Sequence, residues 1–437
     1  MPPIRYGITA DTGGHIAYVL EAARAQAGLP QVDSVSVVTR LFEDEHLGAD
    51  YARASERLGA KATIDRIATA NRRYLEKEDL SRDLPAFADA LCAHLIGRPR
   101  RPDVLHAHFA DAAQVAEVVR RRLGIPFVYT PHALGMDKRG MAADDPRLDQ
   151  RIAAERGALA EADAVIVSTR NEADRQVAAY QVPGLENRLW QISPGVPQLG
   201  MGLRSHRSGG PAPWQPTPWD RSLDDAAKPI ILAIARPIRK KNLVGLVRAF
   251  AANDELRRRT NLVILAGQHE GGVPSDEQRA VVAELRRWAA TPALRGRFAL
   301  PDRHDTADAA ALYRRAAAGG VFVNPALHEP FGLTLIEAAA AGVPVVATGR
   351  GGPADIIATT GHGLLVDPLD EPAIGAACLR VVSDPALHRR LSRAGLDNAH
   401  WFSWSRYADR SVALYATLGR AARPALPARP VPERAVA

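Results

Sequence analysis

The sequence has few of the features that mark membrane, secreted or metal-binding proteins. No apolar run approaches the roughly 20 residues that a membrane-spanning helix requires, and no basic segment followed by an apolar one marks a secretory signal. Cysteine occurs only at Cys92 and Cys378, which are far apart and lie in helical patterns, so neither a disulfide framework nor a metal-ligand spacing is present. We therefore expect a cytoplasmic protein without an integral membrane segment or a bound metal.

The charge is not strongly one-sided. Lysine and arginine number 56 against 49 aspartates and glutamates, which gives a net charge of +7. The short arginine clusters at 98–101 and 120–122 contain no interleaved aromatic residues and accompany no nucleic-acid-binding motif. A solvated arginine-rich surface and a pocket for anionic substrates both fit this balance, and we expect no nucleic-acid partner.

Length and periodicity predict two α/β domains. A chain of 437 residues is too long for one ordinary core. Short apolar strands alternate with helical patterns, which is typical of parallel sheets covered by helices on both faces. We expect two doubly wound Rossmann-like domains facing a cleft. The boundaries that the pattern favours are a first domain at 1–198, a linker at 199–228, a second domain at 229–400, a helix returning to the first domain at 401–420 and a disordered tail at 421–437.

The expected elements follow from the same periodicity. In the first domain we expect strands at 4–9, 35–39, 104–107, 127–130 and 164–168, and helices at 16–27, 84–96, 112–123 and 148–160. In the second domain we expect strands at 230–235, 262–266, 321–324, 343–348 and 363–366, and helices at 243–251, 281–288, 307–317, 333–340, 371–383 and 386–399. Ligands of such sheets bind beyond the carboxyl ends of the strands, so motifs at those ends are the candidate sites.

Two segments of the second domain have this placement. The first, RPIRKKN at 236–242, follows the first strand and places four cations within six residues, which suits a diphosphate. A solvated basic turn is the alternative interpretation. The second, NPALHEPFGLTLIEA at 324–338, passes from a strand through a loop into a helix. The turn GGP at 351–353 is also open enough for an anion.

The carboxylates of the second segment suggest hydroxyl recognition. Gly332, Leu333 and Thr334 place backbone N–H groups at the start of a helix. Glu337 lies one turn inside that helix and is able to accept two hydroxyl hydrogens, as from a ribose, while Glu329 in the loop suits sugar hydroxyls. The alternative is one helix-capping carboxylate and one that faces solvent.

In the first domain the candidates are glycines and histidines. DTGGH at 11–15 pairs two glycines at a helix start, where N–H groups approach an anion closely, although a plain tight turn is the alternative. It lacks the three spaced glycines of the dinucleotide fingerprint. His106 and His108 flank one strand end, and His132 follows the next. No third metal ligand stands at a firm spacing from them.

Together these segments resemble the retaining glycosyltransferases of the two-Rossmann-domain (GT-B) type. Within that type they are most similar to the group of sucrose-phosphate synthase, sucrose synthase and mannosylfructose-phosphate synthase. The resemblance covers nearly all of residues 4–419. The segments that carry it are DTGGH at 11–15, YLEKEDL at 74–80, HAHFADA at 106–112, HALGMDK at 132–138, STRNE at 168–172, RPIRKKN at 236–242, NPALHEPFGLTLIEA at 324–338, GGP at 351–353 and GLLVDP at 363–368.

The resemblance implies transfer of a hexose from a nucleotide sugar, with UDP-glucose favoured, to fructose 6-phosphate with retention of configuration. It implies no cofactor beyond this nucleotide-sugar co-substrate and no catalytic metal. The catalytic residues that it implies are His132, Arg236, Lys241 and Glu329. The donor-binding residues are Gly14, Gly332, Leu333, Thr334 and Glu337. The acceptor-binding residues are Gly13, His15, Arg73, Lys77, Phe109, Lys138 and Arg151.

The departures from the family pattern gather on the acceptor side. His15 replaces a glutamine, Arg73 a lysine, Phe109 a tyrosine and Ala133 a serine, and each loss or gain of a hydrogen-bonding group changes which hydroxyls are recognised. Alternatives therefore stay open: GDP-mannose as donor, a sucrose-synthase-like reaction, a lipid or polyol acceptor, or a non-catalytic sugar-nucleotide-binding protein. The oligomeric state is also open.

Overall fold

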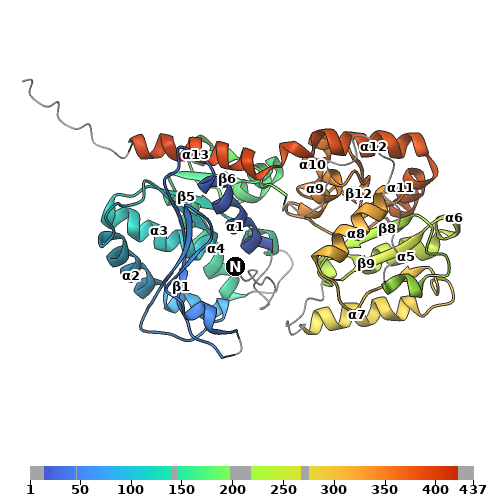
Figure 1. Cartoon of the computed structure of the whole chain (residues 1–437), viewed down its shortest axis with the longest axis horizontal. Coiled ribbons are helices and arrows are strands. Elements are labelled where there is room, and N and C mark those ends of the chain that lie inside the picture. The colour runs from blue at the N-terminus through green and yellow to red at the C-terminus, as the bar shows by residue number, and fades with distance from the viewer. Residues whose placement is uncertain are drawn as a thin grey trace, which may run out of the picture. The chain divides into compact units, whose positions relative to one another are not determined.

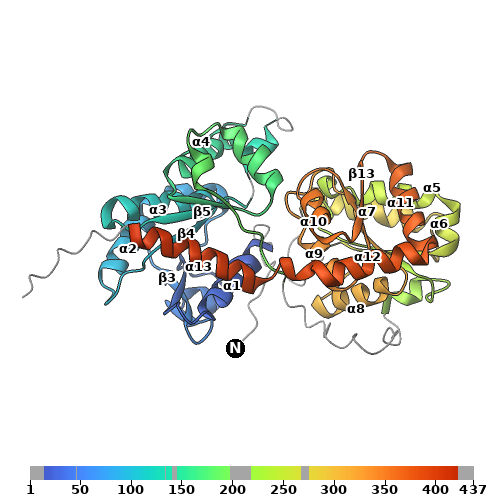
Figure 2. The same ribbon diagram turned by 90° about the horizontal axis from the view of Figure 1, so that it is seen from above.

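In the computed structural model the described residues are 14–45, 47–132, 134–139, 145–196, 218–266 and 275–421. They form two compact units, and the chain passes between them several times. The large unit contains Val167–Ala179, Gln191–Tyr407 and the N-terminal residues up to Ala25. The small unit contains Gln26–Ile166, Tyr180–Trp190 and the residues from Ala408 onward. Figures 1 and 2 show the elements of each unit.

A six-stranded sheet forms the centre of the large unit. Its strand order is β10-β9-β8-β11-β12-β13, and all neighbouring strands run parallel. Counted from β8, this is the order 3-2-1-4-5-6 of the doubly wound nucleotide-binding fold. The strands are β8 (Ile230–Ile234), β9 (Asn261–Leu265), β10 (Phe298–Ala299), β11 (Val321–Asn324), β12 (Val345–Thr348) and β13 (Gly363–Val366).

Apart from the edge strand β13, the longer strands of this sheet are almost wholly buried, which is why they are continuous apolar runs. Ile231 and Val323 join one hydrophobic cluster, whereas their neighbours Leu232 and Phe322 join another on the opposite face. The first cluster includes side chains of α5 (Leu243–Ala252), α7 (Asp276–Ala289), α11 (Glu371–Ser383) and α12 (Pro385–Asn398). The second includes side chains of α8 (Thr306–Ala317), α9 (Leu333–Ala340) and α10 (Pro353–Thr360).

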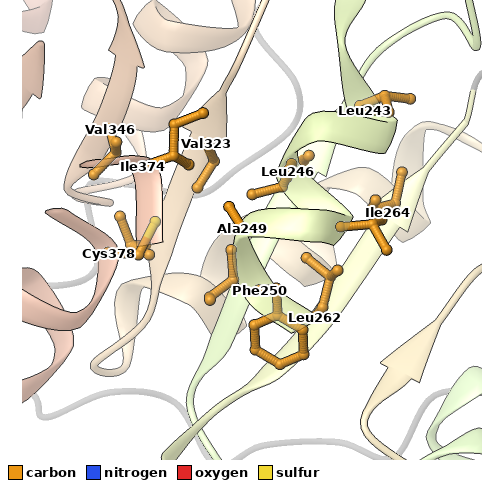
Figure 3. Close-up of a cluster of buried hydrophobic side chains, with 14 of the residues drawn as sticks. Leu243, Leu246, Ala249, Phe250, Leu262, Ile264, Val323, Val346, Ile374 and Cys378 are labelled. Carbon is orange, nitrogen blue, oxygen red and sulfur yellow. The ribbon is translucent and has the colours of Figure 1, made fainter. Parts of the chain in front are cut away.

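The first cluster shows how the helices are attached (Figure 3). Leu246 and Phe250 of α5 pack on Ile264 and its neighbours, while Ile374 and Cys378 of α11 pack beside them. Each such fully buried side chain contributes roughly 1.5–3 kcal/mol through removal of apolar surface from water. Burial also raises the pKa of the Cys378 thiol to about 12, so this cysteine is an inert part of the core.

Among the described residues, the small unit contains two sheets, which helices α2, α3 and α4 accompany, and most of α13 (Trp404–Ala421). One sheet has the order β1-β3-β2, with β2 antiparallel to β3, and the other has the order β4-β5-β6-β7. The strands are β1 (Val35–Arg40), β2 (Ser55–Arg57), β3 (Ala62–Ile67), β4 (Leu105–His108), β5 (Phe127–Thr130), β6 (Ala164–Val167) and β7 (Leu189–Gln191). The helices are α2 (Leu84–Ile96), α3 (Phe109–Leu123) and α4 (Pro146–Glu161). A cluster that includes Leu91, Cys92 and Val119 joins α2 to α3.

Helices α1 (Gly14–Ala27) and α13 (Trp404–Ala421) lie against each other and contribute residues to both units. The Tyr18 ring of α1 meets Trp404 and Tyr407 of α13 edge-on, at centroid distances of 5.2 and 5.5 Å. Just over two turns beyond Tyr18, Gln26 Nε2 donates to Ser411 Oγ of α13 at 2.9 Å. None of the helices in the described ranges is long and apolar enough to cross a membrane.

The elements agree closely with the expected ones. The bounds of β5, β11, β13, α2, α9 and α11 are those expected from the sequence, and most of the others differ by one to a few residues. The strand expected at 4–9 lies outside the described residues. The sequence reasoning missed β2, β3, β7, β10, α6 (Asp254–Arg259) and α10, and its expectation of parallel sheets does not hold for the β2–β3 pair. The expected domain boundaries remain predictions.

Part of the expected linker packs on the large unit. Its residues before 218 lie outside the described ranges, but 218–222 form a short 3-10 helix. There the buried Asp220 forms an ion pair with Arg315 of α8. A charged pair this well buried fixes the segment to the unit, because separating the two charges would leave one of them unpaired.

Candidate active site

The first part of the candidate site is the loop after β8. Arg236 is exposed, and a 3-10 turn at Arg239–Lys241 follows it. The turn ends at Asn242, whose φ of 51° reverses the chain in the left-handed region. The side-chain amide of Asn242 donates to the carbonyl oxygens of Pro325 at 3.1 Å and Pro368 at 2.8 Å. The cationic loop is therefore tied to the segments that follow β11 and β13.

The second part is the loop after β11, the strand next to β8. Lys241 Nζ lies 2.6 Å from Glu329 Oε2, and Asn324 Nδ2 donates to the same oxygen at 3.1 Å. A backbone hydrogen bond joins the same two loops, since Leu327 N donates to Lys240 O at 2.9 Å. The strand order changes direction between β8 and β11, and ligands of doubly wound sheets bind at that point.

The charge of Glu329 is fixed by its partners. Burial alone would raise the pKa of this carboxyl, but the Lys241 ammonium, the Asn324 amide and the nearby Lys240 together hold the pKa below its usual value. Glu329 is therefore an anion at neutral pH. The Lys241 side chain in this pair is 20% exposed, so solvent reaches the cation.

A third loop holds Glu329 from the other side. Glu329 N donates to Arg350 O at 3.0 Å, and Gly352 N donates to Glu329 O at 2.9 Å. Gly351 has a φ of 109°, and a Cβ there would overlap the Glu329 carbonyl oxygen. The glycine pair at 351–352 therefore permits a close approach to the Glu329 backbone, and its suitability for an anion remains a prediction.

The start of α9 lies at the end of the second loop. Gly332 precedes the helix with a φ of 107°, which a side chain would rarely adopt. The first N–H groups of an α-helix lack intrahelical acceptors, and the helix dipole makes them suitable for an anion. The backbones of Gly332, Leu333 and Thr334 thus have the positions that the sequence predicted.

Glu337 is one turn inside α9 and has a buried partner. The Tyr313 hydroxyl of α8 donates to Glu337 Oε2 at 2.9 Å, and its oxygen lies 3.2 Å from Thr334 O. Burial raises the pKa of Glu337 to about 7, and the Tyr313 hydrogen bond offsets part of that rise. The acceptor capacity of this carboxylate therefore changes near neutral pH.

The histidines lie together in the small unit. His108 ends β4, and His132 follows β5, which pairs with β4. His108 Nδ1 lies 2.8 Å from His132 Nε2, and the Phe109 ring lies 4.8 Å from the His132 ring. Phe109 and His132 both have positive φ, 71° and 62°. Such backbone strain is maintained only where surrounding contacts hold it, and it is common at functional sites.

Arg151 has a partner within the small unit. Its Nε lies 2.7 Å from Glu155 Oε1, and the other oxygen of the buried Glu155 accepts from Gly135 N at 2.8 Å and from the Tyr180 hydroxyl. Arg151 thus supports the carboxylate that holds the loop after His132. The sequence did not indicate Glu155 or Tyr180, which are far from that loop along the chain.

The remaining acceptor candidates are only partly described. Arg73 is exposed, and its carbonyl oxygen accepts from Arg40 at 2.6 Å. Lys77 and Lys138 begin and end 3-10 turns, and Gly14 and His15 begin α1, but only their backbones are described. Gly13 and Ala133 lie outside the described residues. Among those that are described, no cluster of three or more potential ligands suits a metal ion.

Sequence reasoning did not identify two residues that donate hydrogen bonds to Glu329 and Glu337. Asn324 stands at the end of β11, and this position after a strand was an available signal. Tyr313 lies on α8 without any local pattern that separates it from an ordinary core tyrosine. Its role follows only from the fold.

Comparison with protein families explains why these loops carry polar groups. The family described as "Glycosyl transferase 4-like domain" matches residues 13–188, and that described as "Glycosyl transferases group 1" matches residues 220–397. The chain belongs to the glycosyltransferases. The second match includes Lys241, Glu329 and Glu337, and the first includes His132, so the candidate residues of both units lie in segments typical of this family.

Two curated relatives of this glycosyltransferase are sucrose-phosphate synthases of Vicia faba and Zea mays. It is 33% identical to a probable sucrose-phosphate synthase of Vicia faba over 94% of its length, and 35% identical to the sucrose-phosphate synthase of Zea mays over 91%. The chain spans slightly less than half of these relatives, 46% and 44% of their lengths.

Solved structures have the same fold. A sucrose-phosphate synthase from Thermosynechococcus elongatus is 26% identical, with a TM-score of 0.74 over 96% of this chain and 97% of that one. The catalytic domain of starch synthase IV from Arabidopsis thaliana, bound to ADP and acarbose, is 16% identical with a TM-score of 0.68 over 95% and 98%. HepE of Anabaena, in complex with UDP and glucose, is 15% identical with a TM-score of 0.64 over 93% and 96%. These likenesses establish the GT-B glycosyltransferase fold.

Proposed function

We propose that the protein transfers glucose from UDP-glucose to fructose 6-phosphate with retention of the anomeric configuration, forming sucrose 6-phosphate. The observation that carries the proposal is the extent of the similarity. Sucrose-phosphate synthases match more than nine tenths of the chain, both among the curated relatives and in the structure from Thermosynechococcus elongatus. A match of that length includes both units and not only the widely shared donor fold.

On the donor side, cationic side chains replace a metal. Arg236 and Lys241 would bind the diphosphate and neutralise the charge that develops as it leaves. The backbone N–H groups of Gly332, Leu333 and Thr334 at the start of α9 would bind phosphate or sugar oxygens. Lys241 is held by Glu329 at 2.6 Å, so it is already placed before a donor arrives.

The carboxylates would select the donor. As an anion, Glu337 would accept both hydroxyl hydrogens of the ribose, and Tyr313 holds the carboxylate in place at 2.9 Å. Glu329 would accept from hydroxyls of the transferred glucose. Gly14 would supply a backbone N–H group to the diphosphate from the start of α1.

His132 would contact the transferred sugar near the carbon that reacts. In the step itself, the bond between the anomeric carbon and the diphosphate oxygen breaks on the same face on which the acceptor hydroxyl oxygen bonds to that carbon. The hydroxyl proton passes to the departing diphosphate, and UDP leaves. No protein nucleophile is needed for this front-face displacement.

The acceptor would be held mainly by cations. Arg73, Lys77, Lys138 and Arg151 are basic residues suited to the phosphate of fructose 6-phosphate. The backbone at Gly13 and the side chains of His15 and Phe109 would contact the sugar. His15, Arg73 and Phe109 differ from the family pattern, so the acceptor is varied in the assay below.

A nucleotide-release assay tests the proposal. UDP-glucose, GDP-mannose and ADP-glucose are each incubated with and without fructose 6-phosphate. We expect UDP release that depends on fructose 6-phosphate, together with a phosphorylated disaccharide detected by mass spectrometry. Release from GDP-mannose alone among the donors, or release independent of fructose 6-phosphate, would contradict the proposed donor or acceptor.

A further inference from the structure

A chain of hydrogen bonds connects the C-terminal helix to the histidines of the small unit. Both ring nitrogens of His106 have partners: Nδ1 lies 2.6 Å from the Tyr415 hydroxyl of α13, and Nε2 lies 2.8 Å from Thr130 Oγ1 at the end of β5. Helix α13 is about 300 residues from β4 in the sequence. A partner at each nitrogen leaves the imidazole little freedom to rotate.

The direction of these bonds follows from Gln26. Its side-chain amide donates to the Tyr415 oxygen at 3.0 Å and to Ser411 Oγ at 2.9 Å, which uses both of its N–H groups. The Tyr415 oxygen accepts this bond, and we assign the phenol hydrogen to His106 Nδ1, which gives both the hydroxyl and the ring a complementary role. The proton of His106 then stands on Nε2 and points to Thr130.

The charge state of His106 agrees with this direction. Burial, together with the neighbouring His132, lowers the pKa of His106 to about 3. The ring is therefore neutral at any pH at which an enzyme of this kind works, and a neutral imidazole has one donor and one acceptor nitrogen. A hydroxyl donor at Nδ1 fixes which nitrogen is the acceptor.

The His106 ring in turn supports the pair beside it. It is stacked on the His108 ring with centroids 4.2 Å apart and planes inclined by 29°. His108 then meets His132 through the 2.8 Å bond between Nδ1 and Nε2. The position of the His132 ring therefore depends on His108, which depends on the orientation of His106.

We propose that Tyr415 and His106 are positioning residues for the transfer reaction, which hold the stacked His108 and His132 rings in one orientation. The inference rests on the proposed role of His132 at the transferred sugar. Tyr415 does not touch the substrate in this account. It fixes the tautomer and rotation of His106, and through the stack it keeps the sugar-facing imidazole in place despite the strained backbone of His132.

The test compares two hydroxyl deletions on the same helix. Tyr415→Phe removes the donor to His106, whereas the control Thr417→Val removes the exposed Thr417 hydroxyl, which bonds only to Leu414 O at 2.7 Å among the contacts described. We expect kcat of Tyr415→Phe to fall about 10- to 100-fold, the range for one lost hydrogen bond to an orienting group. KM for the donor and the affinity for UDP should stay within about twofold, and the control should match the wild type.

A spectroscopic measurement keeps this test separate from the proposed function. In protein labelled with ¹⁵N at histidine, the nitrogen shifts of His106, assigned by their loss in His106→Gln, should report a neutral ring protonated at Nε2. The Tyr415→Phe variant should show a changed population of the two His106 tautomers, whichever acceptor the enzyme uses. If fructose 6-phosphate proves not to be the acceptor, kcat is measured with the acceptor that is found instead.

A second variant covers the case in which Tyr415→Phe folds poorly. Thr130→Val keeps the shape of a buried strand residue and removes the partner of His106 Nε2. It should lower kcat by giving the ring freedom to rotate and should shift the Nε2 signal, while Tyr415 still fixes the acceptor nitrogen. Wild-type kcat with unchanged His106 signals, in whichever of the two variants folds, would overturn the proposal.

Discussion

The ion pair between Lys241 and Glu329 makes a prediction about stability and activity together. Replacing Lys241 by alanine leaves the Glu329 carboxylate buried, with Asn324 as the remaining hydrogen-bond donor described for its side chain. Breaking a fully buried pair from one side costs about 3–5 kcal/mol. Because the Lys241 side chain is 20% exposed and that of Glu329 11%, some water reaches the pair, and we expect a loss of about 2–4 kcal/mol in the free energy of unfolding.

The loss should depend on pH in a defined direction. In the wild type the pKa of Glu329 lies below its unfolded value, so its stabilisation is present above that value and disappears as the pH falls through the folded pKa. In Lys241→Ala the Lys241 ammonium no longer lowers the pKa of Glu329, whereas burial still raises it. The Glu329 carboxyl therefore takes up a proton at a higher pH than in the wild type. The difference in unfolding free energy between the two proteins should therefore narrow on acidification.

Urea unfolding followed by circular dichroism measures the difference, and hydrogen exchange of residues 321–332 reports on the loop itself. The double variant Lys241→Ala, Glu329→Gln removes the unpaired charge and should recover much of the stability. Arg239→Ala, which removes an exposed neighbouring cation, should change stability by less than about 0.5 kcal/mol.

Turnover should behave differently from stability. If Lys241 neutralises the leaving diphosphate, the single and the double variant both lose about 10²–10³-fold in kcat, because neither restores the cation. A Lys241→Ala protein that unfolds at the wild-type urea concentration would refute the reasoning about the buried pair. Recovery of kcat in the double variant would refute the role of Lys241 in leaving-group departure.

Three further predictions follow from single positions. Because burial raises the pKa of Glu337 to about 7 and only the carboxylate accepts both ribose hydroxyls, UDP affinity measured by calorimetry should rise between pH 6 and 8, and in Glu337→Gln it should be weaker and independent of pH. Phe109→Tyr should shift acceptor preference in the nucleotide-release assay, and identical acceptor profiles would remove Phe109 from the acceptor site. Gly351→Ala should lower the melting temperature strongly because its Cβ would overlap the Glu329 carbonyl, whereas Gly361→Ala, with its nearest neighbour at 3.5 Å, should cost only about 1–3 kcal/mol of backbone strain.

The large unit was the more predictable part of the fold. Its strands are buried on both faces, so β8 and β11 are unbroken apolar runs that end in Gly, Pro or polar residues. In the small unit, β3 was missed because Asp65 interrupts its apolar pattern. The fold compensates for this buried carboxylate with the Ser36 and Ser55 hydroxyls and with Arg98 at 3.3 Å, all of which are distant in sequence. Helix α10 was missed because its Gly-Gly-Pro start was read as a turn.

The candidate site divides in a similar way. Lys241, Glu329 and Glu337 could be predicted as site residues from sequence because each lies in a segment between a strand end and the first turns of a helix. The pairing of Lys241 with Glu329 could not be predicted, because these two residues are 88 positions apart. The tyrosine partners Tyr313, Tyr180 and Tyr415 have no local signature, since a buried tyrosine that orients a functional group has the same sequence context as one that fills the core.

Helix α13 has a practical consequence for any shortened form of this protein. The family matches end at residue 397, and α13 begins at Trp404, so a chain trimmed to the matched segments would retain both donor carboxylates and His132. It would lose Tyr415, whose hydroxyl bonds to His106. It would also lose Trp404 and Tyr407, which pack on Tyr18. Such a protein is expected to bind nucleotide while transferring sugar poorly, and a negative activity result obtained with it would say nothing about the substrates of the full chain.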